Sequence, residues 1–413
     1  MTLLPRRPWC AWSAIAVLLV LVLTAATAAA QPVRAGDLDP DPTGDPFLDM
    51  RFHSTAPTHP GALDADEPAD PGPLDALPNG TILANRAVRV RAPLGFTADF
   101  EAWQLWFKTT DATGAPISSV TTILKPVDWN GHTVSNNYAI DSVGLKCNPS
   151  YQLTHETSLE VPDITRQLLW RGYAVVLTDY QGPKMAYAHG PTQGREVLDG
   201  IRAALAFPDA GLAGSPIAMI GYSGGAIATV WAAQMQPWYA PELVMRGAAA
   251  GGTPADLSLL RKTMDGQPPA SVLYLMAVIG IARVYPGAFD LLNAKGAAAA
   301  QLAKNLCAAS AAYGVVPVSL ASMTRVDPYK TPLVRQIYRD TKAGGAIPTM
   351  PIYLWHGLLD QWIPLAGAQQ LQRDWQAGGA SVTMSVFPCD HITCAFFPAG
   401  VDQIDRWMGR ATG

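Results

Sequence analysis

The sequence predicts an α/β fold in which a mostly parallel sheet is covered by helices on both faces. Continuous apolar runs at 173–178 and 217–220 are typical of strands buried in the middle of a parallel sheet. Segments with helical spacing of apolar residues separate these runs, as expected when strands and helices alternate. Hydrophobic residues make up 49% of the 413 residues and charged residues only 15%, which is enough for one large core.

The first 79 residues are expected to lie outside that core. Residues 1–30 carry Arg6 and Arg7, then an apolar run, then small residues before Gln31, which is the order of a secretory signal peptide. The apolar run is short for a retained membrane anchor. Residues 31–79 are rich in Pro, Asp and Ala and predict an irregular, partly mobile leader rather than a domain.

Residues 80–253 form the first part of the predicted α/β core. Strands are expected at 87–90, 103–108, 119–125, 132–140, 173–178, 217–220 and 245–250. A turn at 110–114 joins the second and third of them, and helices are expected at 159–171 and 193–206.

Residues 254–349 interrupt this rhythm, because they show helical spacing and no convincing strand. The stretch 272–282 is apolar almost all round, which fits either a buried core helix or the wall of a lid over an active site. Residues 350–413 return to the core pattern, with strands at 351–357 and 381–387 and helices at 365–376 and 401–410. The sequence therefore predicts a helical cap inserted into the core.

The cysteines predict disulfides. Export would remove Cys10 and leave four cysteines in an oxidising compartment, where three pairings are possible. Cys389 and Cys394 would close a tight loop around His391, which leaves Cys147 for Cys307. No Cys-x2-Cys motif or histidine pair at ligand spacing accompanies them, so the sequence implies no metal, and it implies no organic cofactor. The net charge of −4, with no run of Lys and Arg, gives no indication of a nucleic-acid partner.

A strand, a glycine-rich turn and a helix meet at Gly221-Tyr222-Ser223-Gly224-Gly225. This is the context of a Gly-x-Ser-x-Gly nucleophile elbow, in which the serine has a strained backbone and its neighbours must be small. The alternative is a glycine-rich turn without chemistry. We interpret Ser223 as a nucleophile.

A serine nucleophile needs a general base and a carboxylate that orients the base. His391 lies in the loop after the last predicted strand, and Asp360 follows the strand before it. The order Ser223, Asp360, His391 is that of α/β-hydrolases. Asp390 is adjacent to His391, so its carboxylate would have difficulty reaching that ring. His356 lies at the end of a buried strand and is interpreted as structural.

Many ordered stretches are similar to the secretory lipases typified by yeast lipase A, over most of the chain after residue 79. They are 138–141, 147–151, 179–182, 198–203, 221–226, 251–254, 292–296 and 356–364. The resemblance implies the same triad, an acyl-binding cap and a disulfide between Cys147 and Cys307. The pair Cys389 and Cys394 departs from the family pattern.

The resemblance also bears on the oxyanion hole, for which the backbone N–H of Gly224 is the first expected donor. The family implies that the side chain of Asp141 is the second donor, and a carboxyl group can donate only when it is protonated. Without the family, Asp141 is interpreted as a cap or turn residue.

These features together predict an exported serine carboxylic-ester hydrolase. The expected activity is that of a lipase that cleaves acylglycerols, with a lipid ester as substrate and a lipid–water interface as a possible site of action. The alternatives left open are a carboxylesterase for short or soluble esters, an acyltransferase, and a decayed hydrolase that only binds lipid. The sequence does not indicate the oligomeric state.

Overall fold

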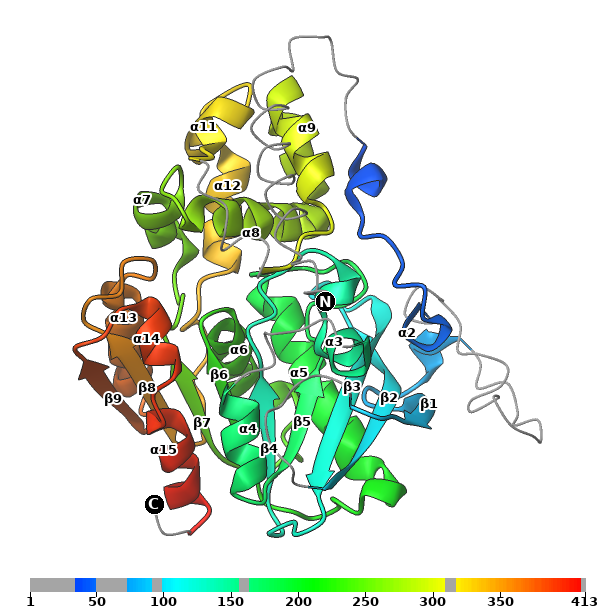
Figure 1. Ribbon diagram of the computed structural model, residues 1–413. Coiled ribbons are helices and arrows are strands. Elements are labelled where there is room, and N and C mark those ends of the chain that lie inside the picture. Colours follow the sequence, from blue (N-terminus) through cyan, green and yellow to red (C-terminus); the bar gives the residue numbers. More distant parts are fainter. Residues whose placement is uncertain (1–33, 50–72, 91–98, 156–162, 309–316, 410–413) are drawn as a thin grey trace, which may run out of the picture.

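The centre of the molecule is a nine-stranded sheet with the order β1-β2-β3-β5-β4-β6-β7-β8-β9 (Figure 1). The computed structural model describes residues 34–49, 73–90, 99–155, 163–308 and 317–409. The strands are β1 (Ile82–Ala87), β2 (Phe100–Thr110), β3 (Pro116–Pro126), β4 (Thr133–Asn137), β5 (Ala174–Thr178), β6 (Ile217–Tyr222), β7 (Met245–Gly251), β8 (Ile352–Gly357) and β9 (Val382–Phe387). The predicted signal peptide lies outside the described residues.

The strands from β5 to β9 run parallel, while β1, β2 and β3 add an antiparallel edge. Helices cover both faces, with α4 and α15 in contact on the near side in Figure 1 and α5 packed against α6. The predicted α/β fold with a mostly parallel sheet is therefore confirmed. The helices around the sheet are α3 (Pro149–His155), α4 (Asp163–Trp170), α5 (Gly190–Ala206), α6 (Gly224–Tyr239), α13 (Leu365–Ala377), α14 (His391–Ala395) and α15 (Ala399–Trp407).

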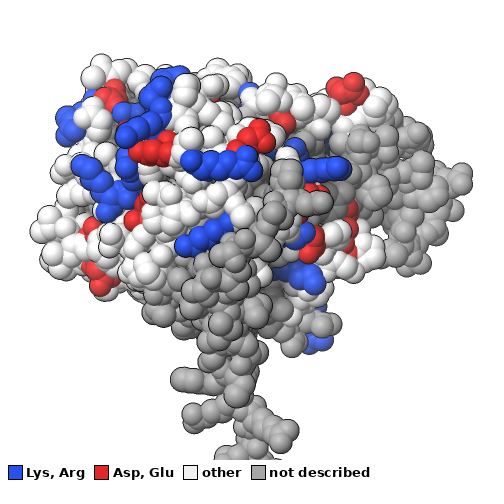
Figure 2. All heavy atoms as spheres, turned by 90° about the horizontal axis from the view of Figure 1, so that it is seen from above, with Lys and Arg blue, Asp and Glu red and all other residues white. Residues whose placement is uncertain are grey.

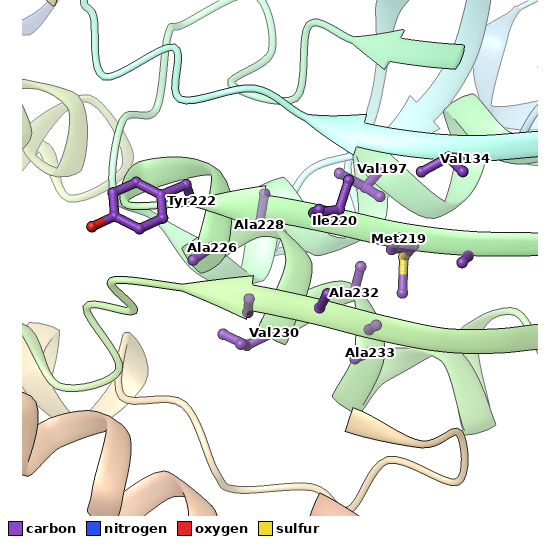
Figure 3. Packing of buried hydrophobic residues seen from close by; sticks show 14 of the residues in the cluster. Val134, Val197, Met219, Ile220, Tyr222, Ala226, Ala228, Val230, Ala232 and Ala233 are labelled. Carbon is purple, nitrogen blue, oxygen red and sulfur yellow. The ribbon is translucent and has the colours of Figure 1, made fainter. Parts of the chain in front are cut away.

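Small side chains let α6 approach the sheet closely. The helix carries Ala226, Ala228, Ala232 and Ala233, all fully buried against the apolar residues of β6 and its neighbours (Figure 3). Alanine also has the highest helix propensity, so the same residues favour the helix and its packing. This packing fixes the start of α6 at the end of β6.

Two strand predictions were wrong in their bounds. The first strand is β1 at Ile82–Ala87, not 87–90, and the strand predicted at 132–140 is the shorter β4. Edge position explains the first error, because only Leu83 and Ala84 of β1 are buried and the edge strand lacks a clear alternation. The helix expected at 159–171 is α4, and residues 156–162 are outside the described part.

The segment between β7 and β8 forms a helical cap that lies above the ends of the parallel strands (Figure 1). Its helices are α7 (Leu260–Met264), α8 (Ala270–Val284), α9 (Ala294–Ala303), α11 (Leu320–Met323) and α12 (Pro332–Asp340). Helix α8 is buried over most of its length and is the centre of a separate apolar cluster in the cap. No described helix combines the length and hydrophobicity needed to cross a bilayer.

The leader is more closely attached to the body than its composition predicts. Its described parts contain η1 (Ala35–Leu38), α2 (Pro46–Asp49) and η3 (Leu74–Ala76). Leu38 is buried in the cap cluster, and Leu48 is buried against the antiparallel edge of the sheet. These parts are irregular apart from three short helices, but a few buried leucines and ion pairs anchor them to the body.

Arg283 joins the leader and the cap to the core. Its guanidinium donates hydrogen bonds of 2.7–3.0 Å to the carbonyl oxygens of Leu38, Val143, Lys184 and Lys304. The residue is 2% exposed, and burial lowers its pKa to about 10, so it remains charged at neutral pH. One buried cation therefore holds four segments that are far apart in the sequence.

Replacing Arg283 with Gln is expected to lower the free energy of unfolding by about 3 kcal/mol, because buried carbonyl groups would lose a charged donor. Urea unfolding measures the change. The exposed Arg246 on β7 is the matched control, and Arg246→Gln should change stability by less than about 0.5 kcal/mol. Equal stability of the two variants would contradict the linking role of Arg283.

Candidate active site

Ser223 occupies a strained turn between β6 and α6. Its backbone has φ 55° and ψ −121°, which is unfavourable for a residue with a side chain. Its N–H donates to the carbonyl of Gly251 over 2.9 Å, which secures the turn to β7. The strain keeps the serine at the start of α6, above the end of the sheet.

Close contacts require glycine on both sides of Ser223. A Cβ atom on Gly225 would lie 1.8 Å from the carbonyl oxygen of Asn137, and one on Gly221 would lie 2.3 Å from the carbonyl oxygen of Gly225. A Cβ atom on Gly224 would lie 1.5 Å from Oδ1 of Asp141. Glycine at 224 therefore allows the carboxyl group of Asp141 to lie directly beside the first residue of α6.

A chain of hydrogen bonds joins the three residues selected from the sequence. Oγ of Ser223 is 2.9 Å from Nε2 of His391, and Nδ1 of His391 is 2.7 Å from Oδ2 of Asp360. Ser223 lies at the end of β6, Asp360 follows β8 and His391 follows β9, so all three meet where parallel strands end. This is the edge of an α/β sheet at which ligands bind.

The backbone and neighbouring rings hold His391. The hydroxyl of Tyr222 donates to the carbonyl of His391 over 2.6 Å, and the rings of Tyr222 and Trp362 lie 5.2 and 5.3 Å from the imidazole. Asp390 instead caps α14 by accepting a 2.7 Å hydrogen bond from the N–H of Thr393. The structure thus brings Asp360, and not Asp390, to the imidazole.

Asp360 is held as a carboxylate. Burial favours its neutral form, but hydrogen bonds from His391 and from the N–H of Ile363 outweigh that effect and lower its pKa. The N–H of Trp362 adds a further hydrogen bond of 3.0 Å to Oδ1. An ionised Asp360 can fix the tautomer of His391 and stabilise the ring when it becomes positively charged.

His356, which we interpreted from the sequence as structural, lies beside Asp360. Its Nε2 lies 2.9 Å from the carbonyl oxygen of Ile363 and 3.4 Å from Oδ2 of Asp360. Burial lowers the pKa of His356, so the ring is neutral at pH 7. Its Nδ1 has no hydrogen-bond partner in the described parts of the chain, so the proton belongs on Nε2. The spacing of four residues between His356 and Asp360 was the only signal in the sequence.

Asp141 lies beside Gly224, the residue after Ser223, and has a left-handed conformation with φ 44°. Two buried tyrosines adjoin it. Burial keeps the pKa of both tyrosines, Tyr180 and Tyr187, well above the usual value, and the adjacent carboxyl group of Asp141 adds to this effect. Tyr187 is also hydrogen-bonded to that carboxyl group. Tyr187 is therefore a neutral donor to Asp141 at every relevant pH. No motif in the sequence marks these tyrosines as neighbours of Asp141.

The Asp141 loop is also tied to the cap. The N–H of Val143 donates to the carbonyl of Leu306 over 3.0 Å, and a disulfide joins Cys147 to Cys307. A second disulfide joins Cys389 to Cys394, on either side of His391. Both pairings are those favoured by the sequence. In the described residues, no group of three or more His, Cys, Asp or Glu side chains is arranged to hold a metal ion.

Comparisons with known proteins show which proteins this chain is similar to. The family model of secretory lipases matches residues 148–412, which is more than half of the chain. A secreted triacylglycerol lipase of Malassezia restricta is 31% identical over 312 residues, covering 70% of this chain and 66% of that protein, just under two thirds of its length. A probable inactive lipase of Mycobacterium tuberculosis is 32% identical over 309 residues, covering 70% of this chain and 68% of that protein.

Among solved structures, Candida antarctica lipase A in its closed state is similar in fold and sequence. The TM-score is 0.77 and the identity 25%, with 91% of this chain and 88% of that chain covered. An esterase of Xanthomonas oryzae that degrades rice cell walls shares the fold, with a TM-score of 0.60 and 15% identity over 81% of this chain and 97% of that chain.

His356 should affect the rate through Asp360. His356→Leu removes the N–H donor beside Asp360. We expect kcat to fall about tenfold with little change in KM, because a less well oriented His391 would lose about 1.4 kcal/mol of transition-state stabilisation. His356→Gln keeps an N–H donor and should restore part of the rate. Steady-state kinetics on a soluble ester measures both variants.

A merely structural role for His356 predicts a different result. Both variants would then lose thermal stability to a similar extent, and their kcat per folded molecule would equal that of the wild type. Circular dichroism melting curves recorded on the same preparations separate the two cases.

Proposed function

This chain belongs to the secretory lipase family, and from this premise we propose that it is a serine hydrolase that cleaves carboxylic esters, with triacylglycerols as substrates. One relative is named a probable inactive lipase, so membership in the secretory lipase family does not by itself establish that this chain is active. The observation that supports the proposed activity is the chain of hydrogen bonds from Ser223 through His391 to Asp360. These three groups lie at the hydrogen-bond distances that acyl transfer by a serine nucleophile requires.

The proposed reaction starts with Ser223. Neutral His391 accepts the hydroxyl proton through Nε2 while Oγ attacks the ester carbonyl carbon, and the carbonyl oxygen becomes an oxyanion. Collapse of this intermediate breaks the bond to the alcohol oxygen, which takes the proton from His391. An acyl-enzyme on Ser223 remains. A water molecule then gives a proton to His391 and attacks the carbonyl carbon of the acyl group. The second intermediate collapses with cleavage of the bond to Oγ, and Oγ takes the proton back from His391, which releases the fatty acid and regenerates Ser223.

Two donors are proposed for the oxyanion. The N–H of Gly224 begins α6, a helix of 16 residues whose N-terminal end favours negative charge. The carboxyl group of Asp141, directly beside Gly224, is the second donor in its protonated form. Tyr187 donates to one oxygen of that carboxyl group, which leaves the other oxygen to carry the proton toward the substrate.

The cap is proposed to bind the acyl chain. Helix α8 approaches the loop after β5 so closely that a Cβ atom on Gly280 would lie 2.5 Å from the N atom of Tyr187. Tyr187 adjoins Asp141, so the apolar cap helix lies next to the proposed oxyanion site. A long acyl chain leaving the reaction centre would find apolar side chains there.

Secretion is part of the proposal. Related proteins of Malassezia are named secreted lipases, and the two disulfides of this chain fit an oxidising environment outside the cytoplasm.

Hydrolysis of p-nitrophenyl esters from acetate to palmitate tests the activity. We expect the highest kcat/KM at eight carbons or more, because the apolar cap gains binding energy of about 0.8 kcal/mol for each buried methylene group. Ser223→Ala should abolish turnover without loss of folding. A maximum at acetate or butyrate would favour a carboxylesterase, and residual activity near wild type in Ser223→Ala would remove Ser223 from the mechanism.

Replacement of Asp141 tests the oxyanion hole. Asp141→Asn keeps a neutral donor and should retain substantial activity, whereas Asp141→Ala should lower kcat about a hundredfold or more, the usual loss for one oxyanion donor. If Asp141→Ala changed only KM, the residue would be structural, as the interpretation without the family suggested.

A further inference from the structure

Exposed apolar side chains concentrate beside the catalytic histidine. Eleven large apolar side chains are clearly exposed in the described parts of the chain, and five of them lie within residues 358–396. Their exposed fractions range from 43% to 63%. The five are Leu358, Leu359, Val386, Ile392 and Phe396, which we call the apolar rim.

The fold brings the segments of the apolar rim together. The N–H of Leu358 donates to the carbonyl of Phe387 over 2.7 Å, and that of Leu359 to the carbonyl of Cys389 over 3.1 Å. The disulfide from Cys389 to Cys394 then fixes α14, which carries Ile392 and leads to Phe396. Three segments therefore lie side by side where β8 and β9 end (Figure 1).

This surface is directly connected to the catalytic groups. Leu359 precedes Asp360, and Ile392 follows His391, in the sequence and in the same short loops. A monomeric protein rarely exposes adjacent large apolar residues without a function, because contact between apolar surface and water is unfavourable. Whatever covers the apolar rim therefore meets the protein next to its reaction centre.

The charge of this region indicates what covers it. Between Asp374 and Asp402 the only formally charged side chain is Asp390, and no Lys or Arg is present. In the view from above, Lys, Arg, Asp and Glu side chains are interspersed with wide uncharged areas (Figure 2). An anionic membrane would be attracted by clustered cations, which the apolar rim lacks. The apolar rim therefore fits an uncharged apolar surface better than an anionic membrane.

We propose that the apolar rim is the surface through which the protein docks on a droplet of neutral lipid, a step that rests on the proposed lipase function. Triacylglycerols with long acyl chains form a separate oil phase, so the enzyme must meet them at an oil–water boundary. Docking transfers the rim side chains from water to oil and places Asp360 and His391 at that boundary.

Flotation with droplets of trioctanoin tests this proposal. The full chain with Ser223→Ala is used so that the droplets are not consumed. Leu358→Ser and Phe396→Ser lie on different segments, and each should weaken partition to the droplets about tenfold, because a half-exposed leucine or phenylalanine contributes about 1–2 kcal/mol when oil covers it. Together they should weaken it about a hundredfold.

Val127→Ser and Val244→Ser are the matched controls. Both valines are more than 75% exposed, and they lie at the end of β3 and the start of β7, on the edge of the sheet opposite to the rim. Neither control should change partition. Equal flotation of the rim and control variants would overturn the proposal, as would binding to phosphatidylglycerol vesicles in place of trioctanoin.

The rim variants must also be active on a soluble substrate. With Ser223 intact, they should hydrolyse p-nitrophenyl butyrate at the wild-type rate and trioctanoin more slowly when the droplet area is limiting. Loss of both activities would contradict a role in docking alone. Sedimentation that shows a dimer broken by Leu358→Ser would assign the rim to a second copy of the chain instead.

The docking proposal and the lipase proposal fail in different ways. If the wild type hydrolyses no ester, the proposed function fails, while flotation still reports on the apolar rim. If esters are cleaved but rim variants float like the controls, only the docking surface fails.

Discussion

The strained backbone at Ser223 is the constraint on which the site depends. A residue with φ 55° between β6 and α6 persists only because its surroundings leave no alternative. Glycine at 221 and 225 lets the turn fold against itself and against β4, and the alanines of α6 hold the helix close to the sheet. The strain is local, but the packing that maintains it involves the whole centre of the sheet.

The elements around Ser223 are positioned by contacts from distant parts of the chain. Asp141 approaches because residue 224 has no side chain, and its loop is tied to the cap by the Cys147–Cys307 disulfide and by Arg283. On the other side, Asp360 is held by backbone N–H groups and by His356. The proposed oxyanion hole and the base are thus supported by two separate networks. A loosened cap would disturb the first network and leave the second intact.

The sequence was sufficient for much of this architecture, and its errors have physical causes. Buried parallel strands carry a continuous apolar signal, so β5 and β6 were placed within a residue or two. The edge strand β1 has one partner and few buried residues, and its predicted position was wrong. Composition predicted an irregular leader, yet Leu38 and Leu48 anchor parts of it, because two buried side chains do not alter the average of 49 residues.

The sequence by itself determined the fold class, the turn at Ser223 and the order of Ser223, Asp360 and His391 at the ends of successive strands, because these depend on local spacing and on the end of each strand. It could not determine which buried groups support Asp360 and the proposed oxyanion site. His356, Tyr187 and Arg283 carry no motif, and their contacts join residues up to 245 positions apart. The apolar rim is likewise a product of tertiary structure, since only the pairing of β8 with β9 brings residues 358–359 beside residues 386–396. Local pattern specifies which residues form a strand or turn, while burial and contact across the fold decide what surrounds them.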